Sequence, residues 1–252
     1  MFHSRTMISL KLQPQISKPE PKPESEPEPE PEPGHKYTAV IVEPRKHKAL
    51  QFVVTNFLEN LSDDWNIMIF HGTTNEQYVN DILQTLSSNR ITTIKLPYAN
   101  IPVKQYSLLL TSAAFYEAIP TEVILIFQTD TLIFSKNKHK INDFLQYDYV
   151  GAPWPPGYTP IGEVGNGGLS LRKKSKMLHI INTVPYRDEP EDNYFSRQKL
   201  YTPTGYEARN FSVEMVFHAT SFGCHKPFNR SYGDALIKLY PELLELHKLN
   251  CS

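Results

Sequence analysis

Residues 123–134, VILIFQTDTLIF, decide the fold of this chain: five apolar residues lead into Gln128, Thr129 and Asp130, and a second apolar run follows. A short run of branched apolar residues that ends abruptly in polar ones predicts a buried parallel strand. The last side chains of such a strand lie at the sheet edge where open α/β proteins bind ligands. Because an unpaired buried carboxylate is costly, Asp130 needs a partner and is a candidate for function. The alternative is a hairpin turn in which Asp130 bonds to its own backbone.

Upstream of this stretch, segments with the strand pattern alternate with segments at helical spacing. The predicted strands are residues 38–42, 65–70 and 91–96, and the predicted helices are residues 50–61, 76–86 and 106–118. In the first helix, Leu50, Val53, Val54 and Phe57 follow the i, i+3, i+4, i+7 spacing of an amphipathic face. Strands and helices in this alternation predict right-handed βαβ units around a mostly parallel, Rossmann-like sheet.

The amino-terminal segment has a different composition. Residues 18–33, KPEPKPESEPEPEPEP, alternate proline with charge, which favours neither a helix nor a paired strand. We therefore expect a disordered tail rich in Pro and Glu over residues 1–36, acting as an extended tether, and a single domain over residues 37–252. The alternative is that the acidic tract docks onto a basic partner.

The composition excludes several classes of partner. Among 252 residues, 26 Lys and Arg oppose 27 Asp and Glu, so the formal net charge of -1 provides no general attraction to nucleic acid or to anionic membrane. Cys224 and Cys251 are too few for a disulfide framework, which favours a reducing compartment. No apolar run is long enough for a signal peptide or a membrane span. We expect a soluble, cytoplasmic protein of undefined oligomeric state.

After residue 134 the regular alternation ends. Residues 148–168, DYVGAPWPPGYTPIGEVGNGG, combine glycine and proline with aromatic residues, which predicts an irregular wall or lid over a site. Gly165, Gly167 and Gly168 surround Asn166 and precede the strand-like LSLR. Glycines there would let the backbone approach a ligand closely, or they would serve a tight turn or bulge that needs positive φ.

Three further polar motifs follow. EDNYF, residues 191–195, sets two acids at a predicted helix start; NFSVE, residues 210–214, ends a strand-like run on a Glu; and GCHKPF, residues 223–228, contains His225. The chain has neither a GxGxxG nor a GxxxxGK[ST] motif, so it carries no dinucleotide fingerprint and no P-loop.

These side chains together indicate metal and diphosphate chemistry. A hard divalent ion that bridges phosphates needs oxygen ligands and keeps positions open for substrate. Asp130, one imidazole and a diphosphate would satisfy such an ion, and Mn²⁺ accepts the nitrogen ligand more readily than Mg²⁺. A second carboxylate nearby would then take the proton of an acceptor hydroxyl. This is the equipment for transfer from a nucleotide sugar.

The order of Gln128-Thr129-Asp130, VGAPW, GNGGLSLR, EDNYF and GCHKPF resembles that in glycosyltransferase-like domains of unknown function (DUF5672-like) of the GT-A superfamily. The resemblance covers about residues 37–230, and the succession from GNGGLSLR to EDNYF is its most specific part. It implies an α/β, GT-A-like fold whose mostly parallel sheet is flanked by helices, with an irregular acceptor-side half. It also implies a metal-dependent, inverting glycosyltransferase that takes a UDP-sugar as its first candidate donor. The acceptor is an undefined glycan, protein or small molecule.

The resemblance also implies roles for individual residues. Asp130 and His225 would be ligands of Mn²⁺ or Mg²⁺. Asp192, with Glu191 beside it, would be the catalytic base. The nucleotide sugar would be contacted by Gln128, Arg45, Glu43, Asn166, Gly167 and Gly168. For Arg45, an exposed loop position beside Lys46 and Lys48 is the alternative.

One departure from the family pattern bears on function. Gln128 stands where the DxD motif has its first Asp, and an amide brings no negative charge to the metal. A catalytically silent nucleotide- or carbohydrate-binding module is therefore the alternative function. A nucleotidyltransferase on a similar sheet is disfavoured, because no basic, glycine-rich loop follows the first predicted strand.

Overall fold

A computed structural model describes residues 34–158, 162–228 and 230–251. Residues His35–Ser252 form one compact unit. The tail expected over residues 1–36 lies almost wholly outside the described residues, so its expected disorder stays a prediction.

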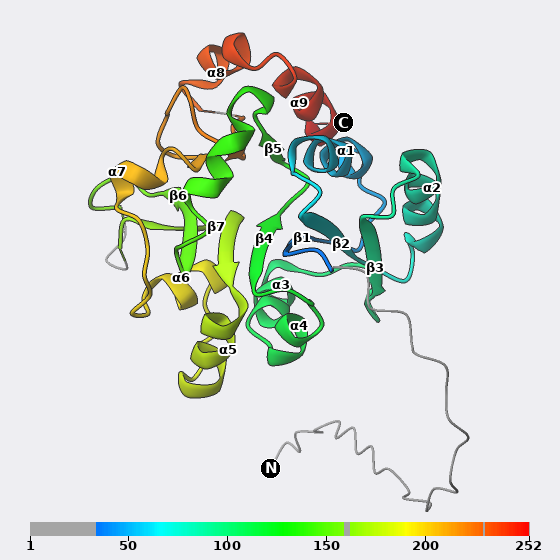
Figure 1. The fold of residues 1–252 in the computed structure, drawn as a ribbon, viewed down its shortest axis with the longest axis horizontal. Helices are drawn as coiled ribbons and strands as arrows, with labels where there is room; N and C mark the ends of the chain where they lie inside the picture. Colours follow the sequence, from blue (N-terminus) through cyan, green and yellow to red (C-terminus); the bar gives the residue numbers. More distant parts are fainter. Residues whose placement is uncertain (1–33, 159–161, 229, 252) are drawn as a thin grey trace, which may run out of the picture. The chain divides into compact units, whose positions relative to one another are not determined.

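The central sheet has six strands in the order β3-β2-β1-β4-β7-β6 (Figure 1). Four strands run parallel: β1 (Tyr37–Glu43), β2 (Trp65–His71), β3 (Ile91–Lys95) and β4 (Val123–Phe127). β7 (Val164–Lys173) pairs antiparallel with β4, and β6 (Tyr149–Pro153) pairs antiparallel with β7. The buried parallel strand predicted from VILIF is therefore confirmed, and it lies between β1 and β7 near the centre of the sheet.

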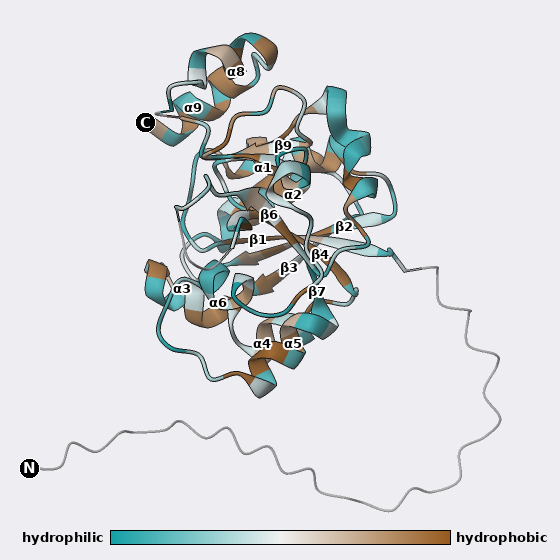
Figure 2. Cartoon of the chain, turned by 90° about the vertical axis from the view of Figure 1, so that its left-hand side faces the viewer, coloured by the Kyte–Doolittle hydropathy of each residue, from teal (hydrophilic) through white to brown (hydrophobic). Residues whose placement is uncertain are grey.

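Helices cover both faces of this sheet. They are α1 (Leu50–Asn60), α2 (Glu76–Leu86), α3 (Val103–Leu110), α4 (Ala113–Glu117) and α5 (Lys174–Thr183). Successive strand residues point to opposite faces. Accordingly, Ile41 packs in one core with Phe57 of α1, and Val40 packs in a second core with Phe115 of α4. Figure 2 shows the strands of the sheet largely in brown, between helices that mix brown and teal residues.

A second, three-stranded sheet has the order β5-β9-β8. Its members are β5 (Thr131–Ile133), β8 (Ser212–Val213) and β9 (Gly223–His225). The two apolar runs of residues 123–134 thus belong to different sheets, and the alternative of a hairpin is wrong. The chain turns between them, where the Thr131 backbone N–H donates to the Gln128 carbonyl at 3.2 Å. This turn leaves Asp130 at the C-terminal edge of the parallel strands.

The remaining described helices follow β5 in the chain. They are a 3-10 helix, η1 (Ser135–Asp143), and α6 (Glu191–Ser196), α7 (Gly205–Ala208), α8 (Gly233–Leu239) and α9 (Leu243–Cys251). The acidic pair of EDNYF opens α6, as its position predicted.

Two predicted segments differ from the structure. The helix expected over residues 106–118 is two helices, because the Thr111 hydroxyl donates back to the Ser107 carbonyl at 2.8 Å and the Ser112 hydroxyl caps α4. The wall expected to be irregular over residues 148–168 contains β6 and the start of β7. Its glycines 165, 167 and 168 lie inside a strand and have no positive φ, so a turn does not explain them.

Candidate functional site

A cavity of about 340 Å³ opens where β1 and β4 end. Its lining includes Glu43 and Arg45 after β1, Gln128, Thr129 and Asp130 after β4, Tyr106 of α3, and Lys226 after β9. The structure thus brings four of the predicted site residues, Glu43, Arg45, Gln128 and Asp130, into one cavity. Parallel strands whose ends meet at one edge produce this grouping.

Glu43 and Arg45 form a two-residue unit in this cavity. The Glu43 side chain is buried, and Arg45 donates to its carboxylate from Nε and Nη2 at 2.8 Å each and from the backbone N–H at 2.9 Å. The hydrogen bond to Glu43 raises the pKa of Arg45 although burial opposes it. A guanidinium has five N–H donors, so Arg45 keeps donors for a ligand while Glu43 holds it in place.

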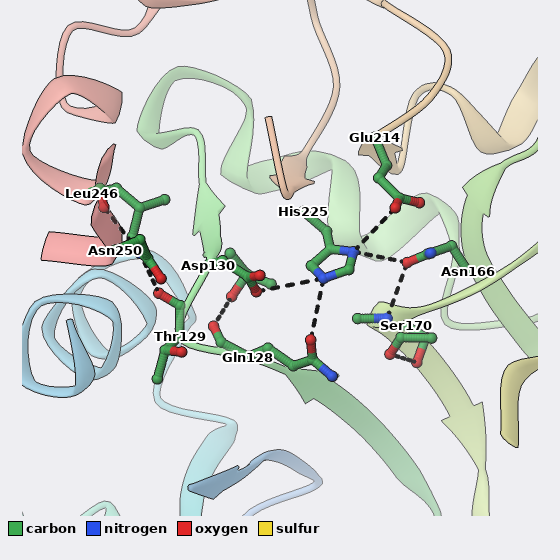
Figure 3. A network of polar contacts seen from close by, with 12 residues as sticks. Gln128, Thr129, Asp130, Asn166, Ser170, Glu214, His225, Leu246 and Asn250 are labelled. Carbon is green, nitrogen blue, oxygen red and sulfur yellow. Dashed lines mark hydrogen bonds and ion pairs between the residues drawn. The ribbon is translucent and has the colours of Figure 1, made fainter. Parts of the chain in front are cut away.

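His225 lies at the centre of a polar network (Figure 3). The Asn166 Oδ1 atom accepts from the Gly168 backbone N–H at 3.0 Å, and the same oxygen lies 2.9 Å from His225 Nδ1. Nδ1 must therefore carry the proton and donate it. A second acid, Glu214, lies 3.8 Å from Nδ1. Contacts of this kind fix the tautomer and leave Nε2 of a neutral ring with a free lone pair.

The Nε2 atom faces two further acceptor oxygens. Gln128 donates from its amide nitrogen to the Tyr106 hydroxyl at 3.2 Å, which turns its Oε1 toward His225 Nε2 at 3.2 Å. Asp130 Oδ1 lies 3.4 Å from Nε2 and, within the described residues, is buried with no hydrogen-bond partner. Burial raises the pKa of Asp130, but the contact with His225 and its charge lower it more, so the net shift is downward.

Such a convergence of acceptors requires a proton or a cation between them. One solution is a doubly protonated imidazolium, and the other is a divalent ion bound by Nε2 and the two oxygens. Adjacent ligands of an octahedral ion with bonds near 2.1 Å lie about 3 Å apart. The separations of 3.2 and 3.4 Å suit that arrangement.

Asp130, His225 and the neutral Gln128 thus fit a divalent ion that takes its other ligands from a substrate. The described part of the chain contains no group of three or more His, Cys, Asp or Glu side chains able to hold a metal by itself. An ion at this place would depend on oxygens from the bound ligand, because a single carboxylate supplies little charge.

Glu214, which follows β8, was predicted only as the end of a strand-like run. It is buried, its Oε1 lies 3.8 Å from both His225 Nδ1 and Arg230 Nη2, and its Oε2 has no hydrogen-bond partner among the described residues. Burial raises the pKa of Glu214. The sequence signal was its position at the end of the strand-like run NFSV, as Asp130 lies shortly after the end of VILIF.

Close packing explains two glycines of the GNGG segment. A Cβ added at Gly168 would lie 2.1 Å from His225 Cε1, and one added at Gly167 would lie 2.3 Å from Glu191 Oε1. The backbone therefore approaches protein side chains at these positions. The predicted contact of Gly167 and Gly168 with a donor stays a prediction.

Glu191 and Asp192, the acidic pair at the start of α6, have different surroundings. Glu191 is buried in an ion pair with the fully buried Arg172, with Nη1 to Oε2 at 2.9 Å and Nη2 to Oε1 at 3.2 Å. Arg172 also donates to the Tyr116 hydroxyl at 3.1 Å and to the Ser170 hydroxyl at 3.0 Å. Burial raises the pKa of Glu191 and the Arg172 charge opposes that shift. Glu191 therefore compensates a buried charge, an arrangement that the sequence did not reveal.

Asp192 accepts two backbone hydrogen bonds, from Gly167 at 3.3 Å and from Asn193 at 2.8 Å. Gly167 faces α6 and Gly168 faces His225, so the acidic pair and the imidazole lie on opposite faces of β7. The structure does not bring Asp192 into the cavity that holds Asp130.

Comparison with known proteins gives a family and a fold. A family model described as "Protein of unknown function (DUF5672)" matches residues 90–225, more than half of the chain. No curated protein matches the chain. Among the described residues, no helix is long and apolar enough to cross a membrane.

Solved structures of the galactosyltransferase LgtC have a similar fold. The complex of LgtC with donor and acceptor sugar analogs has a TM-score of 0.54 and 11% sequence identity, and the match covers 84% of this chain and 94% of LgtC. An active-site mutant of LgtC has a TM-score of 0.52 and 11% identity, and the match covers 81% of this chain and 95% of the mutant. The likeness shows a glycosyltransferase-like GT-A fold.

Proposed function

Because the chain belongs to the DUF5672 family and has a glycosyltransferase-like fold, we propose that it is a metal-dependent glycosyltransferase. It takes a sugar from a nucleotide-diphosphate donor, with a UDP-sugar as the first candidate, and passes it to a glycan, protein or small-molecule acceptor. The observation that carries this proposal is the convergence of Asp130 Oδ1, Gln128 Oε1 and His225 Nε2 beside a cavity of about 340 Å³ at the sheet edge.

The donor lies in that cavity. Arg45, held by Glu43, and Lys226 provide positive charge for the nucleotide and its diphosphate. Lys226 is exposed and its backbone N–H donates to the Asp130 carbonyl at 3.1 Å, which ties this charge to the metal-binding edge. Lys226 belongs to the GCHKPF motif, and its position beside His225 is the sequence signal that points to it.

Asp130 and His225 hold the metal, and Gln128 contributes its carbonyl oxygen. When bound, a divalent ion would neutralise charge that develops on the leaving diphosphate. Asn166 and Glu214 hold the imidazole so that Nε2 stays directed at Asp130.

Asp192 deprotonates the acceptor hydroxyl, and transfer proceeds with inversion. Its carboxylate is oriented by the backbone N–H groups of Gly167 and Asn193. For this role the acceptor must approach from the α6 side of β7. Glu191 acts as a positioning residue, because its pair with Arg172 fixes the start of α6.

The test is donor turnover with a panel of UDP- and GDP-sugars, in Mn²⁺ and in EDTA. We expect hydrolysis or transfer with Mn²⁺, its loss in EDTA, and a loss of about 100-fold or more in Asp130→Asn and His225→Ala. Asp234→Asn, in the first turn of α8 and outside the lining of the cavity that contains Asp130, is the matched control and should keep full activity. A wild-type protein that binds UDP but turns over no donor would contradict the enzyme proposal.

A silent nucleotide-binding module is the second candidate, and Gln128 is the observation that favours it. The two functions differ in metal dependence as well as in turnover. If UDP affinity is the same with and without Mn²⁺, and the same in Asp130→Ala, the metal site has no role and the silent module is the better description.

A further inference from the structure

A second cavity lies at the far end of the β6–β7 hairpin. It has a volume of about 180 Å³, and its walls include Trp154 after β6, Glu163 before β7, and Tyr206 and Arg209 at α7. Trp154 ends the VGAPW motif, but the sequence indicated no role for it or for the other three residues. None of the four lines the cavity that contains Asp130. The volume suits one sugar ring rather than a nucleotide.

The aromatic wall of this cavity is open to solvent. The Tyr206 side chain is 71% exposed, although a large aromatic residue usually gains stability by burial. The Arg209 guanidinium carbon lies 3.7 Å from the centre of the Tyr206 ring, so the cation holds the ring in place. An exposed ring held in a fixed orientation is a surface on which a sugar ring can stack.

The polar wall offers both a donor and an acceptor. The Nε atom of Arg209 is buried. Among the described residues, this atom has no hydrogen-bond partner and the guanidinium forms no ion pair. Glu163 accepts from the Gly205 backbone N–H at 3.1 Å through Oε2, and its side chain is exposed at the cavity wall. Because charges of both signs line the cavity, an uncharged ligand rich in hydroxyl groups suits it better than an anion.

The place of the cavity relates it to the acidic pair. Gly165 of β7 lies against both Trp154 and Ser196 of α6, so the cavity lies on the α6 side of the strand. From Glu163 to Gly167, whose N–H donates to Asp192, the extended chain covers about 13 Å. An acceptor hydroxyl that reacts at Asp192 would therefore lie about this distance from a ligand in the cavity. A further sugar unit of an oligosaccharide acceptor would reach that far.

We propose that the cavity formed by Trp154, Glu163, Tyr206 and Arg209 binds a neutral pyranose of an oligosaccharide acceptor. The apolar face of the ring stacks on Tyr206, and its hydroxyl groups bond to Arg209 and Glu163. This assignment deepens the proposed glycosyltransferase function and rests on it for the word acceptor, but the binding of the sugar can be measured without any turnover.

The experiment is ligand-observed saturation-transfer NMR on the full chain. The probes are methyl β-glucoside, methyl β-galactoside, N-acetylglucosamine, lactose and cellobiose at millimolar concentration. We expect at least one probe to bind, with affinity about tenfold weaker in Tyr206→Ala and unchanged in Tyr206→Phe, because the ring and not the hydroxyl makes the contact. Arg209→Gln should also weaken binding. Tyr201→Ala removes another exposed tyrosine outside the cavity and serves as the matched control.

UDP affinity in Mn²⁺ is measured on the same proteins and should be equal in all of them, which also shows that each variant is folded. The proposal is overturned if the wild-type chain binds none of the five probes, or if Tyr206→Ala binds them as the wild type does. If the glycosyltransferase proposal is wrong, the result is different. The chain then shows no UDP binding or no donor turnover, while its sugar binding still depends on Tyr206.

Discussion

At the scale of single residues, His225 is the centre of the candidate site. Its Nδ1 donates a hydrogen bond to Asn166. The other ring nitrogen, Nε2, faces Gln128 Oε1 and Asp130 Oδ1, so a proton or a metal ion must lie between them. Both solutions place positive charge at the same point. The site is therefore built for a cation beside a carboxylate, and a diphosphate would complete the set of oxygen ligands.

In the proposed metal site the uncharged Gln128 should limit the affinity for the ion, and its substitution tests that expectation. Gln128→Asp adds a second carboxylate beside His225 Nε2 and should tighten Mn²⁺ binding in the presence of UDP by about tenfold. Isothermal titration of Mn²⁺ into the UDP complex measures the change. Gln128→Asn, which shortens the side chain without adding charge, is the control. An unchanged Mn²⁺ affinity in Gln128→Asp would show that the ion does not bind next to this side chain.

Arg172 and Glu191 are a buried pair whose disruption should be costly. Arg172→Met leaves Glu191 buried without its partner and should lower the free energy of unfolding by about 3–5 kcal/mol at neutral pH. Urea denaturation measures this loss, and Lys173→Met, at the neighbouring half-exposed position, is the control. In the double variant Arg172→Met, Glu191→Leu most of the stability should return.

The same variant has a defined pH dependence. Burial raises the pKa of Glu191, and without Arg172 this shift has no opposing charge. A carboxyl whose pKa is raised in the folded state binds a proton more tightly there, so its contribution to stability is greatest at acid pH and is lost as pH rises through the folded pKa. The deficit of Arg172→Met should therefore be smallest below the pKa of an unfolded Glu and grow toward neutral pH. A deficit independent of pH would contradict this account.

At the scale of elements, local patterns predicted β1 to β4, α1 and α2 because apolar periodicity is a property of neighbouring residues. The split between α3 and α4 was missed, because the bonds made by Thr111 and the cap provided by Ser112 compete with a continuous helix and leave the apolar spacing unchanged. The second sheet was not predicted, because β5 pairs with β9, which lies far along the chain. Pairing over such a separation has no local signal.

The candidate site was predictable to a similar degree. Gln128 and Asp130 drew attention as the polar end of one strand, whereas the roles of Glu43 and Arg45, after another strand, came from the family resemblance. The contacts of His225 with Asn166 and Glu214 join segments that only the tertiary fold brings together. Glu191 was predicted at the right helix start, but its partner Arg172 reads in sequence as an ordinary strand residue.

The packing of β7 against β9 permits a test at this scale. Gly168→Ala would place a methyl group 2.1 Å from the His225 ring, which is held on both nitrogens and cannot easily withdraw. We expect the ring to shift, Mn²⁺ affinity to fall at least tenfold, and stability to fall by about 1–3 kcal/mol. Gly233→Ala, where the nearest atom is the Pro227 carbonyl oxygen at 3.6 Å, is the matched control. Equal Mn²⁺ binding in both variants would remove His225 from the metal site.

At the scale of the whole molecule, β7 connects the surroundings of the two cavities, because Gly168 packs on His225 beside Asp130 and the strand begins directly after Glu163, which lines the second cavity. β7 carries Asn166 and Gly168 toward His225 on one face, and Gly165 and Gly167 toward α6 on the other. A donor beside β4 and an acceptor on the α6 side would thus approach each other around the glycine-rich end of β7. The absence of side chains at three of these four positions leaves room for the packing of Ser196, Glu191 and His225 against the strand.

Ligand binding at this edge should stabilise the folded chain as a unit, because the cavity is built from β1, β4, α3 and the segment after β9. With UDP and Mn²⁺ at about 100 times their dissociation constant, linkage predicts about 2.7 kcal/mol of added stability. For a domain of this size that corresponds to a rise in Tm of about 5–10 °C. Differential scanning fluorimetry checks the rise, which EDTA and Asp130→Ala should each abolish, whereas uridine, which has no diphosphate, should produce little shift. A shift with UDP that survives both EDTA and Asp130→Ala would mean that the nucleotide binds without the metal, and the donor site would have to be sought away from Asp130.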